Sequence, residues 1–219
     1  MSVSIIIPTY NRAKFSDLIS LNIKKQDYPM IKEVIVADDG EDNERLILDV
    51  SYTVLYYKIP RINIGEKRNF LMGKATGKYI ACMDTDDFYH PSFLSTSIFN
   101  LIKSGKGVSG SSDMLILHDE KTYKQRCIYL DLLNEATLVF TKEYTLTHKF
   151  SNAMSSEGKG FLTGSLDDIY ETEIEDIMVC IAHKENTVDK LPWTDEKYLA
   201  KIDMTMYEPH LKIFSHLNT

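Results

Sequence analysis

The chain has 219 residues, of which 43% are hydrophobic and 26% are charged, a composition typical of a folded globular protein. Its formal net charge is −7, which argues against non-specific binding to nucleic acid or to an anionic membrane. No stretch has the 18 or more apolar residues of a membrane-spanning helix, and the apolar start lacks the basic region of a signal peptide. We therefore expect a cytoplasmic protein without an integral membrane segment.

The three cysteines, Cys82, Cys127 and Cys180, lie far apart in the sequence. They form no CxxC pair and no zinc-binding spacing, and their odd number leaves at least one unpaired. This pattern indicates reduced cysteines in a cytosolic protein.

The N-terminal region begins with two short apolar runs that predict buried strands, Val3–Pro8 and Glu33–Ala37. A helix is expected between them, around Leu18 to Ile23, and the polar segment "DDGED" follows the second strand as a turn. A third strand is predicted at Tyr52–Tyr57. The pattern already alternates strand and helix.

The alternation continues to about residue 105. Gly65–Ala75 predicts a helix that Gly77 ends, Tyr79–Met83 predicts a fourth strand, and a further helix starts at Pro91. Alternating strands and helices favour a mostly parallel, twisted α/β sheet with helices on both faces.

The second half has a different pattern. Strands of a small mixed sheet are predicted at Val108–His118, Tyr123–Leu130 and Ala136–Thr141. Residues 150–165, rich in Gly and Ser, predict a mobile loop that closes over a site. Helices are predicted at Glu173–Lys184 and, from a Thr194 cap, through "TDEKYLAKIDMTMYE".

Polar residues follow the predicted parallel strands. Because ligands bind beyond the carboxyl ends of such strands, we expect Thr9–Arg12, Asp38–Gly40 and Asp84–Asp87 along one rim. If the chain is extended there, the carboxylates of Asp84 and Asp86 project to the same side and can share one hard cation, Mg²⁺ or Mn²⁺. The alternative is a solvated acidic turn that caps the next helix.

Other charged residues near this rim have two interpretations as well. Asp38 and Asp39 could accept a hydrogen bond from a nucleobase or a ribose, or could cap the following helix. Arg12, Lys67 and Arg68 could hold phosphate, or could be ordinary surface charge. Together these residues favour a nucleoside diphosphate that a metal ion bridges to the protein.

Several segments in the same order resemble a known family. "SVSIIIPTYNR", "EVIVADDG" and "GEKRNFLMGKATGKYIACMDTDDFYHPSFL" look like the nucleotide-binding half of GT-A glycosyltransferases, especially family 2. The resemblance covers roughly Ser2 to Ser104. The short single-domain form is also similar to small glycosyltransferases encoded by large chlorella viruses, in which case the host cytoplasm is the expected location.

The resemblance implies roles for individual residues. Asp39 matches the aspartate that reads uracil, and Arg68 matches a basic residue near the base and phosphates. Asp84 matches an acid near ribose or metal, Asp86 a metal ligand, and Asp87 an adjoining acid that could replace either. The nucleotide-binding set implied by the family is Pro8, Thr9, Tyr10, Arg12, Asp38, Asp39, Arg68, Asp84 and Thr85, and the metal set is Asp84, Asp86, Asp87 and His183.

The family also implies a catalytic base. In inverting members an acid at the start of an "ED" helix deprotonates the acceptor, which here points to Asp176 with Glu175 beside it. Asp167 and Asp168 are rivals, and acids at a helix start are also favoured by the helix dipole alone. Trp193 could stack on a sugar or belong to the core. The acceptor-region signature is only partly present, so the acceptor and the stereochemical outcome stay open.

The sequence thus predicts one GT-A domain, Rossmann-like, with a nucleotide-sugar-binding half (1–105) and an acceptor-binding half (106–219). The expected reaction is Mn²⁺- or Mg²⁺-dependent transfer of a hexose, with glucose as first candidate, from a UDP-sugar to a hydroxyl of a glycan or glycoprotein. The alternatives are a nucleotidyltransferase, which normally has a glycine-rich phosphate loop that "PTYNRAKF" lacks, and a catalytically silent UDP-sugar-binding module. No nucleic-acid partner is expected, and a homodimer stays open.

Overall fold

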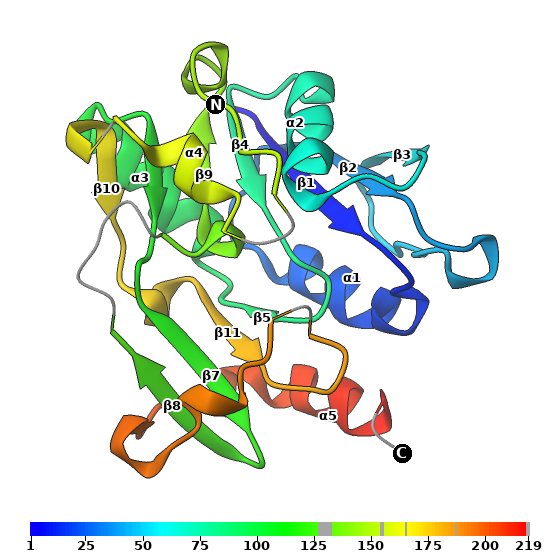
Figure 1. The fold of residues 1–219 in the computed structure, drawn as a ribbon, viewed down its shortest axis with the longest axis vertical. Coiled ribbons are helices and arrows are strands. Elements are labelled where there is room, and N and C mark those ends of the chain that lie inside the picture. The colour runs from blue at the N-terminus through cyan, green and yellow to red at the C-terminus, as the bar shows by residue number, and fades with distance from the viewer. Residues whose placement is uncertain (127–132, 154–155, 165, 187, 218–219) are drawn as a thin grey trace.

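The computed structural model describes residues 1–126, 133–153, 156–164, 166–186 and 188–217 (Figure 1). Within these residues a seven-stranded sheet has the order β10-β6-β9-β4-β1-β2-β3. All its pairs are parallel except those of β9, which runs antiparallel between β4 and β6. The bounds of these strands are β1 Val3–Thr9, β2 Ile31–Asp38, β3 Thr53–Lys58, β4 Tyr79–Cys82, β6 Val108–Gly110, β9 Val139–Thr141 and β10 Ile169–Glu171.

A second, mixed sheet has five strands among the described residues, in the order β12-β8-β7-β11-β5. Its strand β11 pairs in parallel with β7 and antiparallel with β5. The architecture predicted from the sequence, a mainly parallel sheet with a small mixed sheet beside it, is thereby confirmed. The bounds are β5 Phe88–Tyr89, β7 Met114–His118, β8 Lys121–Gln125, β11 Met178–Ile181 and β12 Leu199–Ala200.

Helices cover both faces of the large sheet because β1 is apolar on both sides. Its residues Ile5 and Ile7 belong to the core that includes α1 (Ser16–Lys25) and α3 (Phe93–Ser104). Ile6, which points the other way, belongs to the core that includes α2 (Ile64–Lys74). The predicted helices of the N-terminal half are confirmed.

The start of α2 is fixed by its own cap. The Asn63 side chain accepts a hydrogen bond from the Glu66 backbone N–H at 2.9 Å, and its amide donates to the Glu66 carboxylate at 2.5 Å. This cap sets the first turn of α2, which carries Lys67 and Arg68 toward the end of β1.

The structure corrects the helix predicted at Glu173–Lys184. Only Ile174–Asp176 forms a short 3-10 turn, and Met178–Ile181 is strand β11. All four strand residues are buried because β11 lies inside the second sheet, between β7 and β5. A run that is apolar at every position fits such a strand better than a one-sided helix.

The C-terminal helix is also corrected. The predicted helix from Thr194 is replaced by 3-10 turns at Leu191–Trp193, Glu196–Tyr198 and Thr205–Tyr207, with β12 among them. The helix itself, α5, spans Glu208–Leu217 and packs against α1. Figure 1 shows it to the right of β7 and below β5.

Two further predictions change in detail. The strand predicted at Val108–His118 is divided into β6 and β7, which belong to different sheets. The predicted loop of residues 150–165 contains a short helix, α4 (Gly158–Leu162), whose Phe161 stacks on Phe150 with ring centroids 4.3 Å apart. Part of the strand predicted at Tyr123–Leu130 lies outside the described residues.

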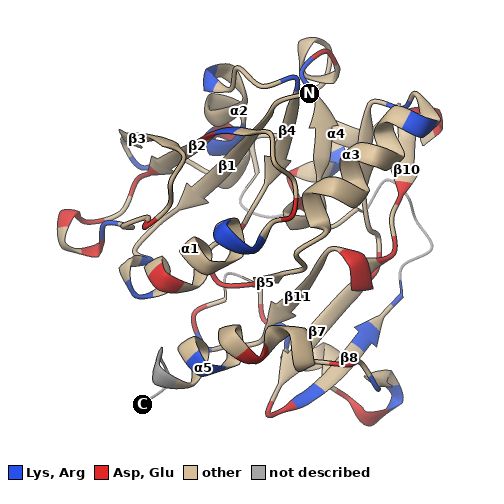
Figure 2. Ribbon diagram, turned by 180° about the vertical axis from the view of Figure 1, so that it is seen from behind, with Lys and Arg blue, Asp and Glu red and all other residues tan. Residues whose placement is uncertain are grey.

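The structure shows how the charged residues and two of the three cysteines are distributed. Figure 2 shows lysines and arginines spread over the ribbon among acidic residues rather than gathered on one basic face. Cys82 and Cys180 are buried free thiols, and Cys127 lies outside the described residues. Across those residues, no helix has the length and apolar character needed to cross a bilayer.

Candidate active site

A cavity of about 470 Å³ opens where β1 and β4 end. The turn after β1 and the segment after β4 form one part of its wall, and the segment after β11 forms another. Its lining includes these residues expected from the sequence: Pro8, Thr9, Tyr10, Arg12, Arg68, Asp84, Thr85, Asp86 and Asp87. The ends of β1 and β4 therefore share this cavity, whereas the predicted residues Asp38, Asp39 and His183 are not among its lining as far as the described residues define it.

The turn after β1 is held by close backbone packing. Asn11 has a φ of 51°, and its side chain accepts a hydrogen bond from the Glu41 N–H at 2.8 Å. A Cβ at Gly40 would lie only 2.6 Å from the Asn11 backbone nitrogen, so this approach requires glycine. The packing presents Thr9, whose buried hydroxyl has no hydrogen-bond partner among the described residues.

Asp38 and Asp39 have different surroundings. The Asp38 carboxylate accepts hydrogen bonds from the Tyr56 hydroxyl and from the Gly40 N–H, so it stabilises the strand end. The buried Asp39 carboxylate instead faces the cavity wall, where it meets Lys67 and Arg61.

The Asp39 carboxylate is surrounded by donors. Arg61 Nη1 lies 3.2 Å away, the Ile62 N–H donates at 3.1 Å, and Lys67 Nζ forms a short ion pair. Burial lowers the pKa of Lys67, an effect that Asp39 partly opposes. The Arg61 guanidinium also lies over the half-exposed Tyr10 ring, 3.5 Å from its centroid.

Asp84, the first acid of the cluster, pairs with Arg68. The distance from Arg68 Nη2 to Asp84 Oδ1 is 3.1 Å, and Arg68 Nε donates to Glu157 Oε1 at 2.9 Å. The Arg68 side chain is only 3% exposed, so this cation is held between two carboxylates inside the protein. Its third nitrogen, Nη1, is buried without a partner among the described residues.

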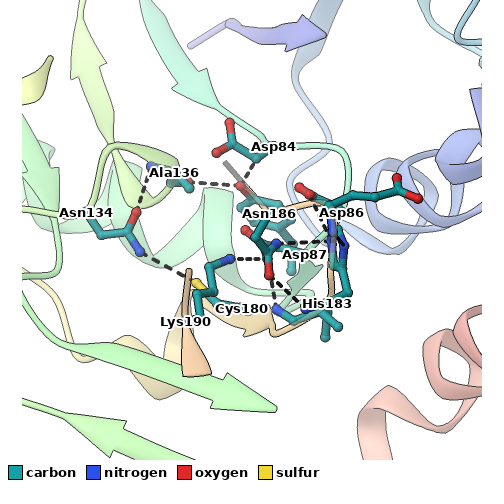
Figure 3. Close-up of polar contacts among 12 residues, drawn as sticks. Asp84, Asp86, Asp87, Asn134, Ala136, Cys180, His183, Asn186 and Lys190 are labelled. Carbon is teal, nitrogen blue, oxygen red and sulfur yellow. Dashed lines mark hydrogen bonds and ion pairs between the residues drawn. The ribbon is translucent and has the colours of Figure 1, made fainter. Parts of the chain in front are cut away.

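Asp86 faces two groups from distant parts of the chain. His183 Nε2 lies 3.0 Å and Arg12 Nη2 lies 3.5 Å from Asp86 Oδ2 (Figure 3). Burial by itself raises the pKa of Asp86, but the His183 hydrogen bond and the charges of Lys190 and Arg12 hold that pKa well below its usual value. Asp86 is therefore an anion at neutral pH.

Asp87 is turned toward the second sheet. Its Oδ1 accepts a hydrogen bond from the Ile181 N–H at 3.0 Å and lies 3.5 Å from Lys190 Nζ (Figure 3). Burial and the neighbouring acids Asp86 and Asp84 raise the pKa of Asp87 to about 6, against the opposing effect of Lys190. Asp87 thus joins the segment after β4 to β11.

Three lysine or arginine side chains and one histidine face the aspartate cluster. Arg68 faces Asp84, Arg12 and His183 face Asp86, and Lys190 faces Asp87. Two of them, His183 and Lys190, lie on the segment after β11. Glu185 on that segment also binds Arg12, with 3.2 Å between Oε2 and Nη1, so the segment is tied to the turn after β1.

Two of the predicted metal ligands, Asp86 and His183, are in direct contact. Within the described residues, no group of three or more His, Cys, Asp or Glu side chains has the arrangement of a metal site. Asp86 Oδ2 and His183 Nε2, however, are 3.0 Å apart. Neighbouring ligands of an octahedral ion with bonds of about 2.1 Å are separated by about 3.0 Å. The same 3.0 Å is also the length of the direct hydrogen bond between the two side chains, so their role as metal ligands stays a prediction.

Glu175 and Asp176 do not line the cavity, as far as the described residues define it. Glu175 forms an ion pair with Lys124, with 2.8 Å between Oε1 and Nζ. Asp176 is exposed at the end of its 3-10 turn, where its charge acts on His90 and Tyr207. Their assignment as the catalytic base stays a prediction.

Several residues of the cavity were not singled out from the sequence. In the sequence these residues lie in segments that were predicted only as strand, loop or helix. No binding or catalytic motif surrounds them that could have singled them out. Trp193, for which stacking or core packing was left open, is half-buried and lines the same cavity. The unforeseen lining residues include Arg61, Ile62, Asn134, Glu135, Glu157, Asn186 and Lys190.

Comparisons with known proteins identify relatives of this chain. Over 166 residues the chain is 29% identical to the poly(ribitol-phosphate) beta-N-acetylglucosaminyltransferase TarS of Staphylococcus aureus. The aligned region covers 67% of this chain and 28% of TarS. The chain thus spans little more than a quarter of that relative.

Solved structures share the fold at low identity. The crystal structure of S. aureus TarS 1–349 in complex with UDP-GlcNAc superposes with a TM-score of 0.61 at 18% identity, over 85% of this chain and 60% of that one. The glucosyl-3-phosphoglycerate synthase from Mycobacterium tuberculosis, in complex with Mn²⁺, UDP and glucosyl-3-phosphoglycerate, superposes with a TM-score of 0.59 at 16% identity. This superposition covers 87% of this chain and 75% of the synthase chain. Both similarities concern the fold.

The family assignment rests on a sequence model. Residues 4–158, which include the turn after β1, the aspartate cluster and Glu157, match the model described as glycosyl transferase family 2. This match covers well over half of the chain. The chain therefore belongs to glycosyl transferase family 2.

Proposed function

We propose that this protein transfers a hexose from a UDP-sugar to a hydroxyl group of a glycan or glycoprotein. The observation that carries the proposal is the cavity at the strand ends. It joins an anionic cluster, five lysine and arginine side chains, and two buried, unpartnered polar groups, Thr9 Oγ1 and Arg68 Nη1. Unpartnered buried donors are costly, and a polyanionic ligand such as a nucleoside diphosphate would satisfy them.

The nucleoside end of the cavity is proposed to lie at Tyr10, Arg61 and Lys67. Tyr10 offers a ring for stacking, and Asp39 behind these residues is the proposed acceptor for the uracil N–H. When the uracil base stacks on the Tyr10 ring, the Arg61 guanidinium would either leave that ring or lie on the other side of the base. The family resemblance and the UDP complexes of similar folds support this placement.

A divalent cation, Mn²⁺ or Mg²⁺, is proposed to bind with the donor. Asp86 and His183 would hold it, with Asp84 nearby, while Asp87 stays with Lys190. When bound, the cation neutralises the charge that develops on the leaving diphosphate. Arg12, Arg68 and Lys190 supply further positive charge from the chain, which would orient the diphosphate and stabilise it as it leaves.

Two donor sugars are proposed for testing. Glucose is the first candidate from the sequence, and N-acetylglucosamine is the second, because TarS carries that sugar in its name and binds UDP-GlcNAc in its structure. We further propose residues 1–105 as the donor-binding half and 106–219 as the acceptor-binding half. The cytoplasmic location and the homodimer stay predictions.

A UDP-release assay tests the proposal. The chain is incubated with UDP-glucose, UDP-GlcNAc or GDP-mannose, with Mn²⁺ or with chelator, and nucleoside diphosphate is measured. We expect release from a UDP-sugar that requires the cation. The silent-module alternative predicts binding without release. The nucleotidyltransferase alternative predicts pyrophosphate release from UTP and a sugar phosphate instead.

A further inference from the structure

A second acidic pair lines the cavity, apart from the aspartate cluster. Glu135 lies in a 3-10 turn, Glu135–Thr137, directly before β9, and Glu157 lies directly before α4. The Glu135 Oε1 accepts a hydrogen bond from the Gly158 N–H at 3.0 Å. Segments 22 residues apart in sequence thus bring two carboxylates to one place.

The contact between the two segments is direct. A Cβ on Gly158 would lie 2.7 Å from Glu135 Cγ and 2.9 Å from Glu135 Oε1, so a larger residue at this position would displace the Glu135 side chain. The Glu135 side chain is therefore positioned by backbone, not by a flexible neighbour. Such rigid support is what a reacting group requires.

Two links fix this pair relative to the donor site. The Tyr89 hydroxyl accepts from the Asp84 N–H at 2.8 Å and donates to the Ala136 carbonyl at 3.0 Å (Figure 3). Arg68 joins Asp84 to Glu157. Both links begin at Asp84, so the acidic pair is held beside the aspartate cluster.

The two carboxylates have different electrostatic environments. Glu157, whose side chain is 5% exposed, is paired with the Arg68 guanidinium. Glu135 has no lysine or arginine within ion-pair distance among the residues that the structure describes. Burial raises the pKa of Glu135, and the negative charge of Glu157 raises it further. Different environments are how two adjacent carboxylates take different roles.

We propose that Glu135 is the general base that deprotonates the acceptor hydroxyl, and that Glu157 is a positioning residue that acts through Arg68 and through Glu135. In this step the acceptor O–H proton moves to the Glu135 carboxylate. The acceptor oxygen forms a bond to the anomeric carbon of the sugar, and the bond from that carbon to the UDP oxygen breaks. The electron pair leaves with UDP, so charge and atoms balance.

This inference rests on the proposed function, and it replaces Asp176 as the candidate base. Glu135 lines the cavity, whereas Asp176 is exposed outside it. A base must reach the proton that it removes. Glu135 meets that requirement better than the solvated Asp176, because its carboxyl group lines the cavity and is held by a backbone N–H.

The experiment uses the full chain with Mn²⁺ and UDP-GlcNAc or UDP-glucose, with water as the acceptor. We expect Glu135→Gln to lower the rate of UDP release by about 10²- to 10⁴-fold, the usual contribution of a general base. The affinity for UDP, measured by calorimetry, should stay near that of the wild type. Glu143→Gln, an exposed change close to β9, serves as the control and should keep the wild-type rate. Asp176→Asn tests the rival base: a loss of rate in Asp176→Asn without one in Glu135→Gln would overturn the inference.

The pH profile separates catalysis from structural support. The wild type should lose activity below the pKa of Glu135, and Glu135→Gln should lack this acidic limb. Glu157→Gln removes the neighbouring negative charge, so its acidic limb should move to lower pH. A folded Glu135→Gln variant with the wild-type rate and profile overturns the inference.

Failure of the proposed function gives a different result. If the wild-type chain binds a UDP-sugar but never releases UDP, the assignment of Glu135 as a general base is wrong. The proposed binding of the donor is not affected by that result. A chain that binds no UDP-sugar removes both proposals.

Discussion

The imidazole Nε2 of His183 lies 3.0 Å from the Asp86 carboxylate, although the two residues are 97 positions apart in the sequence. Asp86 follows β4 of the large sheet, and His183 follows β11 of the second sheet. The contact therefore joins the two sheets at the cavity. It also places the two residues proposed to hold the divalent cation within the spacing of neighbouring ligands.

The first prediction concerns this pair. Asp86→Ala removes one proposed ligand, and it also leaves His183 and Arg12 without their anion. We expect the variant to lose the gain in UDP affinity that Mn²⁺ gives the wild type. Calorimetry with UDP, with Mn²⁺ and with chelator, measures that gain. Asp167→Ala, an exposed acid outside the cavity, is the control, and an unchanged gain in Asp86→Ala would refute the assignment.

The second prediction concerns Arg68. Replacing this buried cation by Met leaves the carboxylates of Asp84 and Glu157 without their partner, which should lower the free energy of unfolding by about 3–5 kcal/mol. Urea denaturation measures this change. Lys74→Met, an exposed change at the end of the same helix, should stay within about 0.5 kcal/mol of the wild type. Equal effects of the two changes would contradict the role given to Arg68.

The third prediction compares two glycines of α2. A Cβ on Gly65 would lie 1.9 Å from the Ser151 carbonyl oxygen, whereas a Cβ on Gly73 meets no atom within 4 Å. Gly65→Ala should therefore destabilise the protein by about 1–3 kcal/mol. Gly73→Ala should stabilise it by about 0.5–1 kcal/mol, because alanine favours the helix. Thermal unfolding of both variants checks the opposite signs; the same sign would argue against the close packing of residue 151 on α2.

The fourth prediction concerns His210 of α5. It is 1% exposed, its two ring nitrogens have no partner among the described residues, and its ring lies 5.3 Å from that of Phe88. Burial, together with the charge of Lys25, lowers the pKa of His210 from 6.5 to about 4.

The direction of the pH effect on stability follows from proton binding by the folded and unfolded chains. Between pH 6.5 and pH 4 the unfolded chain binds a proton at His210 that the folded chain does not, so stability falls as the pH falls through this window. The loss amounts to up to about 3 kcal/mol. His210→Leu should reduce this dependence when urea unfolding is compared at pH 7 and pH 4.5. An identical dependence in the variant would show that His210 does not cause it.

Much of the fold was predictable from local patterns. The runs around Ile5–Ile7, Val34–Val36 and Ile80 are apolar because parallel strands in the middle of a sheet are buried on both faces. The polar residues that follow them could therefore be placed on one rim. The rim prediction depended only on strand direction, which the alternation of strands and helices determines.

The second half was less predictable for a physical reason. "IMVCIA" is apolar at every position, and such a run fits a buried strand or a buried helix equally well until its neighbours are known. Likewise, Glu135 and Glu157 stand in segments without a motif. Only the approach of Gly158 to Glu135 and the position of Arg68 bring them to the cavity, and sequence order does not encode either contact directly.

The central claim is that the cavity at the ends of β1 and β4 binds a UDP-sugar. The most direct test is calorimetric titration of the full chain with UDP-GlcNAc and with UDP-glucose, with and without Mn²⁺. We predict saturable binding of one donor per chain, strengthened by Mn²⁺ and weakened by Arg61→Ala. The absence of binding by any UDP-sugar under both conditions would contradict the account.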